Sequence, residues 1–378
     1  MSHEFKTIEL KVIPSTKRQE FKLLKFFKVA TRLWKYIVDN GITDTSKIKG
    51  MSTKYLAAQF IQGMVREFRA NLKSQRELKK LGKSGKIIAR FKYTVTHFSG
   101  QLVSIIDSKH IKIRKLGTFY VRGLRQLDKY DSYKIVTVKL LKQATGYYVH
   151  LTIKIKKQES SQPKKFLGLD FGIKDAIVTS NGYSINWLAH KKLDKINRRI
   201  VRLQRLLARK IKGSNNFGKT VFLLRKTYEK ASFVKREIKN KIVSVFRNYY
   251  LVFQDELIKQ WHSSGFKGIR RRVQNLGLGE LKAKLKKLEF IQILDSSIAT
   301  TKTCLKCLQK NDISLSDRIY KCSSCGYTMP RDLHSALNML RFFGFSYQEC
   351  MQDSRIQFEF DSHEIAKLQT TGITIQKI

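Results

Sequence analysis

The chain has 378 residues, and its 76 Lys and Arg against 29 Asp and Glu give a formal net charge of +47 at pH 7. Self-repulsion of that size is normally neutralised by a polyanion, so nucleic acid is the expected partner and an anionic membrane surface the weaker alternative. A hydrophobic content of 42% excludes a disordered basic tail, and no apolar run approaches the about 18 residues of a transmembrane helix. The N-terminus lacks a signal-peptide core, so a cytoplasmic protein is expected.

The first 80 residues predict a strand followed by two basic helices. Residues 5–13 alternate apolar and polar side chains, which is the period of a half-buried strand. A capping-box pattern at Thr16 and Gln19 begins an amphipathic helix that should end near Asn40, and a second helix is expected over 53–80. The two helices would fit a solvated hairpin, but their shared charge favours a surface that binds nucleic acid.

Further strands and a linker follow. Segments rich in β-branched and aromatic residues at 111–115, 133–141 and 147–155 predict a small β-barrel, which the N-terminal strand would join. The polar run Ser160–Pro163 marks a linker. After it, a buried strand is expected with Asp170 inside it. A carboxylate in an apolar strand is costly unless it is hydrogen-bonded or binds a metal, so both interpretations stay open.

Residues 190–250 are the most basic stretch, with 19 Lys and Arg against three acids. Two apolar stripes separated by a turn at Gly213–Asn216 predict a helical hairpin. Arginines on its open side are candidates for contacts with phosphates, which do not depend on base sequence: Arg198, Arg199, Arg202, Arg205 and Arg209.

A short apolar strand over 249–254 ends in Asp255 and Glu256. The end of a buried strand is the usual place for chemistry in α/β sheets. Glu256 is favoured as the functional acid, and Asp255 is the alternative. A basic helix over 279–288 and a strand over 290–294 should follow.

Four of the five cysteines stand in one register. Cys304 and Cys307 form a CxxC pair, and Cys322 and Cys325 form a second pair after fourteen intervening residues. Two such pairs supply the four thiolates of a structural Zn²⁺ site, which is favoured over disulfides because the expected compartment is reducing. Cys350 is interpreted as an ordinary thiol.

Asp332 begins a helix whose apolar residues share one face, and taken alone it would be a helix cap. His334 is interpreted as a solvent-side neighbour of Asp332. The pattern weakens beyond Phe343, so the last residues of the chain are expected to form a mobile tail.

Asp170, Glu256 and Asp332 would form a strongly anionic site if the fold brings them together. In so basic a protein, such a cluster persists when divalent cations hold it, and its oxygen ligands suit Mg²⁺ or Mn²⁺. Two such ions about 4 Å apart can activate water and stabilise the leaving oxygen of a phosphodiester. No small-molecule substrate is expected.

Four segments together resemble the split RuvC nuclease domain and inserted zinc ribbon of the TnpB (OrfB-type) family, RNA-guided nucleases encoded by insertion sequences and ancestral to type V CRISPR effectors. The segments are GLDFGI at 168–173, VFQDEL at 252–257, the CxxC pairs with the following Gly-Tyr at 304–327, and RDLHSALN at 331–338. The resemblance implies Asp170, Glu256 and Asp332 as the metal-binding catalytic triad. Arg331 joins the candidate nucleic-acid contacts.

The resemblance also implies an α+β and α/β multidomain fold, with an RNase H-like (RuvC) nuclease domain and an N-terminal β-barrel wedge domain that carries a helical recognition insert. The implied partners are a guide RNA and double-stranded target DNA with a short flanking motif, in the prokaryotic cytoplasm at the nucleoid. The implied segments are a wedge strand (1–14), a recognition domain (15–85), a wedge barrel (86–160), the nuclease domain (164–299, with the hairpin at 190–248, and 329–345), a zinc ribbon that binds target nucleic acid (300–328) and a C-terminal tail (346–378).

The chain departs from the family pattern at three places. QDEL replaces the commoner EDL, which leaves the middle acid open between Asp255 and Glu256; Leu308 replaces the usual Gly after Cys307; and His334 and Ser335 replace small or amide residues. Since all three acids are present, an RNA-guided DNA endonuclease is favoured. The alternatives are a nuclease-inactive RNA-guided repressor, a compact type V CRISPR effector, a structural RNA-binding zinc-ribbon protein and a DNA strand transferase.

Overall fold

The computed structural model describes residues 3–48, 55–82, 94–97, 102–156, 163–255, 267–314 and 317–378. Glu256 and most of the predicted linker at Ser160–Pro163 lie outside these residues. The chain divides into two compact units, Met1–Glu159 and Ser160–Ile378, each with its own main sheet and hydrophobic core. No helix in the described ranges is long and apolar enough to span a membrane.

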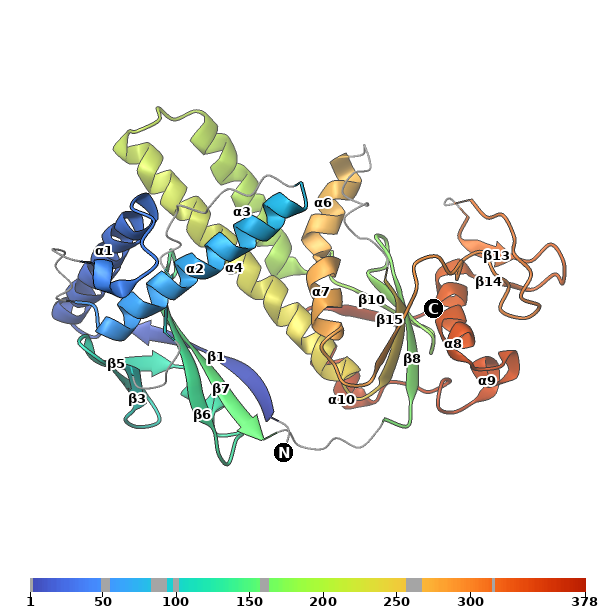
Figure 1. Cartoon of the computed structure of the whole chain (residues 1–378). Helices are drawn as coiled ribbons and strands as arrows, with labels where there is room; N and C mark the ends of the chain where they lie inside the picture. Colours follow the sequence, from blue (N-terminus) through green and yellow to red (C-terminus); the bar gives the residue numbers. More distant parts are fainter. Residues whose placement is uncertain are drawn as a thin grey trace. The chain divides into compact units, whose positions relative to one another are not determined.

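The first unit combines helices with an antiparallel sheet (Figure 1). Its elements in chain order are β1 (His3–Ile13), α1 (Lys17–Asp39), η1 (Thr45–Lys47), α2 (Ala58–Lys80), β2 (Thr94–His97), β3 (Val103–Ile105), β4 (His110–Ile113), β5 (Gly117–Arg122), η3 (Leu124–Gln126), β6 (Lys134–Gln143) and β7 (Gly146–Lys156). The predicted N-terminal strand, both helices and the three strands are confirmed, although α2 begins five residues later than expected.

The seven strands follow the order β2-β6-β7-β1-β5-β4-β3, so the N-terminal strand lies in the middle and pairs with β5 and β7. β2 and β3 are the two ends of this order, and in the described part of the sheet no pairing joins them. Closure into a β-barrel therefore stays a prediction.

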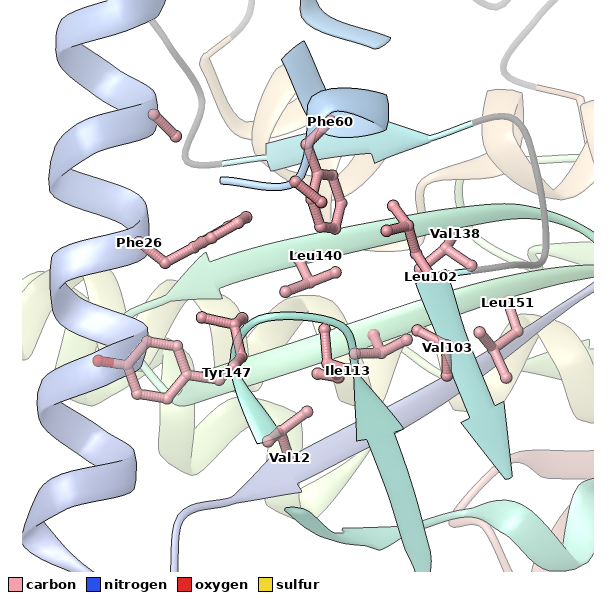
Figure 2. Close-up of a cluster of buried hydrophobic side chains, with 14 of the residues drawn as sticks. Val12, Phe26, Phe60, Leu102, Val103, Ile113, Val138, Leu140, Tyr147 and Leu151 are labelled. Atoms are coloured by element: carbon pink, nitrogen blue, oxygen red, sulfur yellow. The ribbon is translucent and has the colours of Figure 1, made fainter. Parts of the chain in front are cut away.

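The helices of this unit pack against its sheet through aromatic side chains. The predicted capping box is confirmed, since the Thr16 hydroxyl accepts a hydrogen bond from the Gln19 amide at 3.2 Å and Gln19 Oε1 accepts one from the Thr16 amide at 3.3 Å. Phe26 of α1 meets Phe60 of α2 edge to face at a centroid distance of 5.2 Å. Figure 2 shows both rings directed into the cluster that also contains Tyr147 of β7.

The second unit is built around a mixed sheet. Its elements are β8 (Phe166–Phe171), β9 (Ile177–Thr179), β10 (Tyr183–Asn186), α3 (Lys191–Ala208), α4 (Asn215–Phe246), β11 (Tyr250–Gln254), α6 (Lys267–Leu276), α7 (Leu278–Leu285), β12 (Ile291–Leu294), β13 (Ile319–Lys321), β14 (Thr328–Pro330), α8 (Arg331–Phe343), α9 (Tyr347–Gln352), α10 (Ser362–Gln369) and β15 (Thr374–Lys377). The six strands of the main sheet run in the order β12-β11-β8-β9-β10-β15. β8, β11 and β12 are parallel, and the remaining pairs are antiparallel.

Different helices cover the two faces of this sheet. Leu169 and Phe253 belong to a core cluster with residues of α4 and α7, whereas Val252 belongs to another with residues of α8. Gly168 allows the close approach of α8, because a Cβ atom there would lie 2.1 Å from the Ala336 carbonyl oxygen. Figure 1 shows α8 beside β8. Since side chains alternate along a strand, Asp170 faces α8 as Gly168 does.

The expectation of a mobile tail over 346–378 is wrong. This segment forms α9, α10 and β15, and β15 adds a strand to the sheet by pairing with β10. Ile356, Phe360, Leu368 and Ile373 are buried. These apolar residues are too irregularly spaced to give one helical or strand period, but each one fills part of the core.

Candidate functional site

The four predicted zinc ligands lie together. The sulfur atoms of Cys304, Cys307, Cys322 and Cys325 are all within 4.8 Å of one another, and the pairs Cys304–Cys325 and Cys307–Cys322 are 3.7 Å and 3.6 Å apart. A tetrahedron with Zn–S bonds of about 2.3 Å has sulfur atoms about 3.8 Å apart. The donor set and its geometry therefore fit a structural Zn²⁺, in which all four positions are taken by thiolates.

The two knuckles have the same backbone geometry but different residues at the turn. The amide of Leu308 donates to the Cys304 carbonyl at 3.0 Å, and that of Gly326 donates to the Cys322 carbonyl at 3.1 Å. Both residues have a left-handed backbone, with φ of 63° and 68°. This conformation favours glycine, so the first knuckle carries strain at Leu308 that the second does not.

Asn311 organises the contacts around the second knuckle. Its side-chain amide donates to the Tyr320 hydroxyl at 2.7 Å and to the Cys322 sulfur at 3.5 Å, and its Oδ1 accepts a hydrogen bond from the Ser323 amide at 2.9 Å. Outer contacts of this kind orient metal ligands and stabilise the charge of a thiolate. No motif pointed to Asn311, because its position follows from the fold of the ribbon rather than from ligand spacing.

His334 is fully buried, so its interpretation as a solvent-side neighbour is wrong. Its ring stacks on Tyr320 of the zinc ribbon with a centroid distance of 3.6 Å, and its Nε2 accepts a hydrogen bond from the Leu305 amide at 3.2 Å. Burial lowers the pKa of His334 to about 4, so the ring is neutral at pH 7. His334 therefore connects α8 with the segment that carries Cys304.

Asp170 contacts the helix that carries Asp332. The Ser335 hydroxyl donates to Asp170 Oδ1 at 2.9 Å. Ser335 lies one helical turn after Asp332, and residues three apart share one side of a helix. Asp332 itself lies in the first turn of α8, where its Oδ1 is 3.4 Å from Arg331 Nε. The structure thus brings the elements that carry Asp170 and Asp332 together.

The pairing register of β11 with β8 shows which residue of β11 lies next to Asp170. Val252 pairs with Gly168, so Gln254 lies next to Asp170 on the face covered by α8. The Gln254 amide donates to the carbonyls of Asp295 and Ile298, both at 2.7 Å. Gln254 thereby anchors the loop that leads from β12 to the zinc ribbon.

Asp255 points away from this face. Its amide continues the pairing with β12 by donating to the Leu294 carbonyl, so the alternation of side chains extends to it. Its carboxylate accepts a hydrogen bond of 2.6 Å from Lys286, which immediately follows α7 on the opposite side of the sheet. Asp255 is thus not brought to Asp170. Glu256, the favoured middle acid, lies outside the described residues.

The predicted nucleic-acid contacts differ in their surroundings. α3 packs on α4 through Ile200, Leu203 and their neighbours, and the five candidate arginines of the hairpin are exposed. Arg331, in contrast, has only 13% of its side chain exposed, and it contacts Asp332 and the Ser314 carbonyl. The hairpin offers an accessible cationic surface, whereas the side chain of Arg331 is largely buried against Asp332.

Residues 278–339 match the family model of the Cas12f1-like TNB domain. This range includes α7, β12, all four cysteines, His334 and Ser335. No curated protein matches the sequence. Among solved structures, the chain is similar to one described as the mini-RNA-guided endonuclease CRISPR-Cas_phi3, with a TM-score of 0.46, 9% sequence identity, and coverage of 89% of this chain and 92% of that chain.

Proposed function

We propose that the protein is an RNA-guided DNA endonuclease of the TnpB type, in which Asp170, Glu256 and Asp332 bind divalent metal ions. One observation carries the proposal: a residue one turn after Asp332 donates a hydrogen bond to Asp170, which is a carboxylate inside an otherwise apolar strand. A carboxylate in an apolar strand is costly unless it is hydrogen-bonded or binds a metal, and the helix that donates this hydrogen bond also carries Asp332 in its first turn. The match of residues 278–339 to a Cas12f1-like domain supports the same assignment.

The strand order supports the RNase H-like part of the proposal. Three antiparallel strands, β8, β9 and β10, are followed in the chain by β11 and β12, which lie parallel to β8 on its other side. Ligand sites in such sheets form at the carboxyl ends of the parallel strands. Asp170 lies near that end of β8, and Glu256 is two residues beyond the last residue of β11. The Lys286 contact of Asp255 further favours Glu256 as the middle acid.

The proposed residues have separate roles in cleavage. Bound Mg²⁺ or Mn²⁺ would supply an activated water and would stabilise the leaving oxygen of the phosphodiester. The hydrogen bond from Ser335 holds one oxygen of Asp170 and thereby orients the carboxylate. The exposed arginines of α3 would hold the backbone of the guide–target duplex through its phosphates.

The test is to express the protein with the DNA that flanks its gene and to sequence the RNA that co-purifies. The complex is then incubated with a plasmid library of randomised flanks, with and without Mg²⁺. We expect one defined RNA and the Mg²⁺-dependent loss of one class of flank. The Asp170→Asn variant should bind the same RNA and lower cleavage by on the order of 10³-fold or more.

Two other results would redirect the proposal. A defined RNA and target binding without cleavage by the unaltered protein would indicate a repressor. The absence of any defined RNA would contradict guided recognition altogether.

A further inference from the structure

A groove on the first unit places apolar side chains among cations. It has a volume of about 480 Å³ and is lined by residues of α1 and by Lys142 of β6. The residues that matter here are Phe21, Leu24, Lys25, Lys28, Arg32 and Lys142, and together they are called the α1 groove. Phe27, whose ring stacks on Tyr147 in the core, also lines it.

The apolar residues of the α1 groove are not needed for the core. Phe21 and Leu24 are 52% and 42% exposed, whereas α1 buries Leu23, Phe26 and Phe27 against the sheet. An amphipathic helix normally keeps its large apolar residues on the buried side. Lys25 Nζ lies 5.1 Å from the centroid of the Phe21 ring, so the aromatic ring is already part of a cationic surface.

The positive charge of the groove favours an anionic ligand. Four cations line it, and among its described lining residues there is no carboxylate. The occupant should therefore be anionic and should also present a flat apolar surface to Phe21. Unpaired nucleotides have both properties, because phosphates alternate with exposed base faces, whereas a duplex hides those faces in its stack.

We propose that the α1 groove binds single-stranded nucleic acid, with a base stacked on Phe21 and phosphates held by Lys28, Arg32 and Lys142. The volume is in the range of pockets that hold a small molecule, so it can accommodate a nucleotide. This site is independent of the carboxylates, and strand cleavage is not needed to observe it.

The test uses the full-length protein with an oligouridylate and an oligothymidylate of about 12 nucleotides, within the range of single-strand sites. After ultraviolet cross-linking and trypsin digestion, we expect a nucleotide adduct on the peptide Gln19–Lys22, which contains Phe21. The RNA and DNA arms show which of the two strands the groove prefers. An adduct with either one supports the proposal.

Substitutions separate stacking from charge. Phe21→Leu keeps the apolar bulk but removes the aromatic face, so affinity should fall about fivefold or more, the lower end of base–aromatic stacking. Phe5→Leu is the matched control, because Phe5 is 60% exposed on β1 of the same unit and lies outside the groove. The double variant Lys28→Gln, Arg32→Gln should reduce the slope of log affinity against log salt by about 1.4.

Two results would overturn the proposal. One is the absence of an adduct on Gln19–Lys22 together with an unchanged affinity of Phe21→Leu. The other is loss of binding to phosphatidylserine vesicles in Phe21→Leu while oligonucleotide binding is unaffected, which would assign the groove to an anionic membrane surface.

Discussion

The zinc centre and the proposed carboxylate site of the second unit both involve α8, but they are assembled in different ways. The zinc ligands come from two CxxC knuckles within 22 residues of chain, and the short loops themselves bring the sulfurs together. The proposed carboxylate site would need β8, the end of β11 and the start of α8, elements separated by up to 160 residues. One site is organised by local geometry and the metal, the other by the packing of the whole unit.

This difference determines what maintains each site. Four thiolates confined to one small volume repel one another, so the zinc centre depends on its ion. The contact between Asp170 and α8 is made by protein atoms, through the close approach at Gly168 and the hydrogen bond from Ser335. His334 and Asn338 connect the two sites, since His334 stacks on Tyr320 and Asn338 donates to the carbonyls of Thr300 and Thr303 at 2.7 Å each.

Cys322→Ser should have the largest effect. Structural Zn²⁺ contributes on the order of 10 kcal/mol to the folding of small zinc domains, and three thiolates with one hydroxyl retain little of it. We expect the zinc content, measured by mass spectrometry of the purified protein, to fall from one ion per chain to a small fraction. Amide exchange over 300–330 should rise to nearly unprotected rates.

Cys350→Ser is the control for this change. Cys350 is buried in the hydrophobic cluster that contains Val252 and residues of α8, outside the zinc centre. Burial raises its pKa to about 12, which agrees with its interpretation as an ordinary thiol. The variant should keep its zinc. If exchange over 331–340 rises in Cys322→Ser as much as over 300–330, then α8 depends on the ion and the two sites are not separately maintained.

The zinc centre was also easier to predict from the sequence than the contacts around Asp170. The zinc ligands were predictable because their spacing alone specifies the geometry, and β8, β11 and the hairpin of α3 and α4 were predictable because their periodicities are strong. Ser335 and His334 stood out only as departures from a family pattern, and the burial of His334 could not be predicted. Asp170, the partner of Ser335, lies far away in sequence, and Tyr320, the partner of His334, lies in the zinc ribbon. The periodicity of a helix does not predict tertiary contacts of this kind.

Gly168→Ala should damage the carboxylate site and leave the zinc centre intact. The added Cβ would lie 2.1 Å from the Ala336 carbonyl oxygen, a backbone atom that moves only if α8 moves. Overpacking of this kind costs about 3 kcal/mol, and it separates the elements that carry Asp170 and Asp332. We expect a lower free energy of unfolding and the loss of Mg²⁺-dependent cleavage, with the zinc content unchanged.

Gly279→Ala tests whether these losses are specific to the approach of α8. Gly279 is the second residue of α7, and a Cβ there would meet no atom within 4 Å. Alanine fits the first turn of a helix without strain, so this variant should be at least as stable as the unaltered protein and should cleave normally. Normal cleavage by Gly168→Ala would mean that the contact between β8 and α8 does not build the site.

The smallest expected effect is a pH dependence at His334, the residue that connects the two sites. The pKa of His334 is lowered to about 4 by burial, against about 6.5 for an unfolded chain. Between these values the unfolded state binds a proton that the folded state does not, so stability falls as the pH falls. From pH 6.5 to pH 5, the expected loss is about 1.5 kcal/mol.

The measurement is amide exchange at Leu305, whose N–H donates to His334 Nε2, corrected for the intrinsic rate at each pH. His334→Gln keeps a hydrogen-bond acceptor but does not titrate. Between pH 7.5 and 5, its opening free energy should therefore fall by less than that of the wild type. Protonation of the zinc thiolates would affect both proteins equally and cancels in the comparison. The exposed His363→Gln should follow wild type. If His334→Gln also follows wild type, the acid sensitivity arises at the zinc centre, and α8 reports the state of the metal rather than its own histidine.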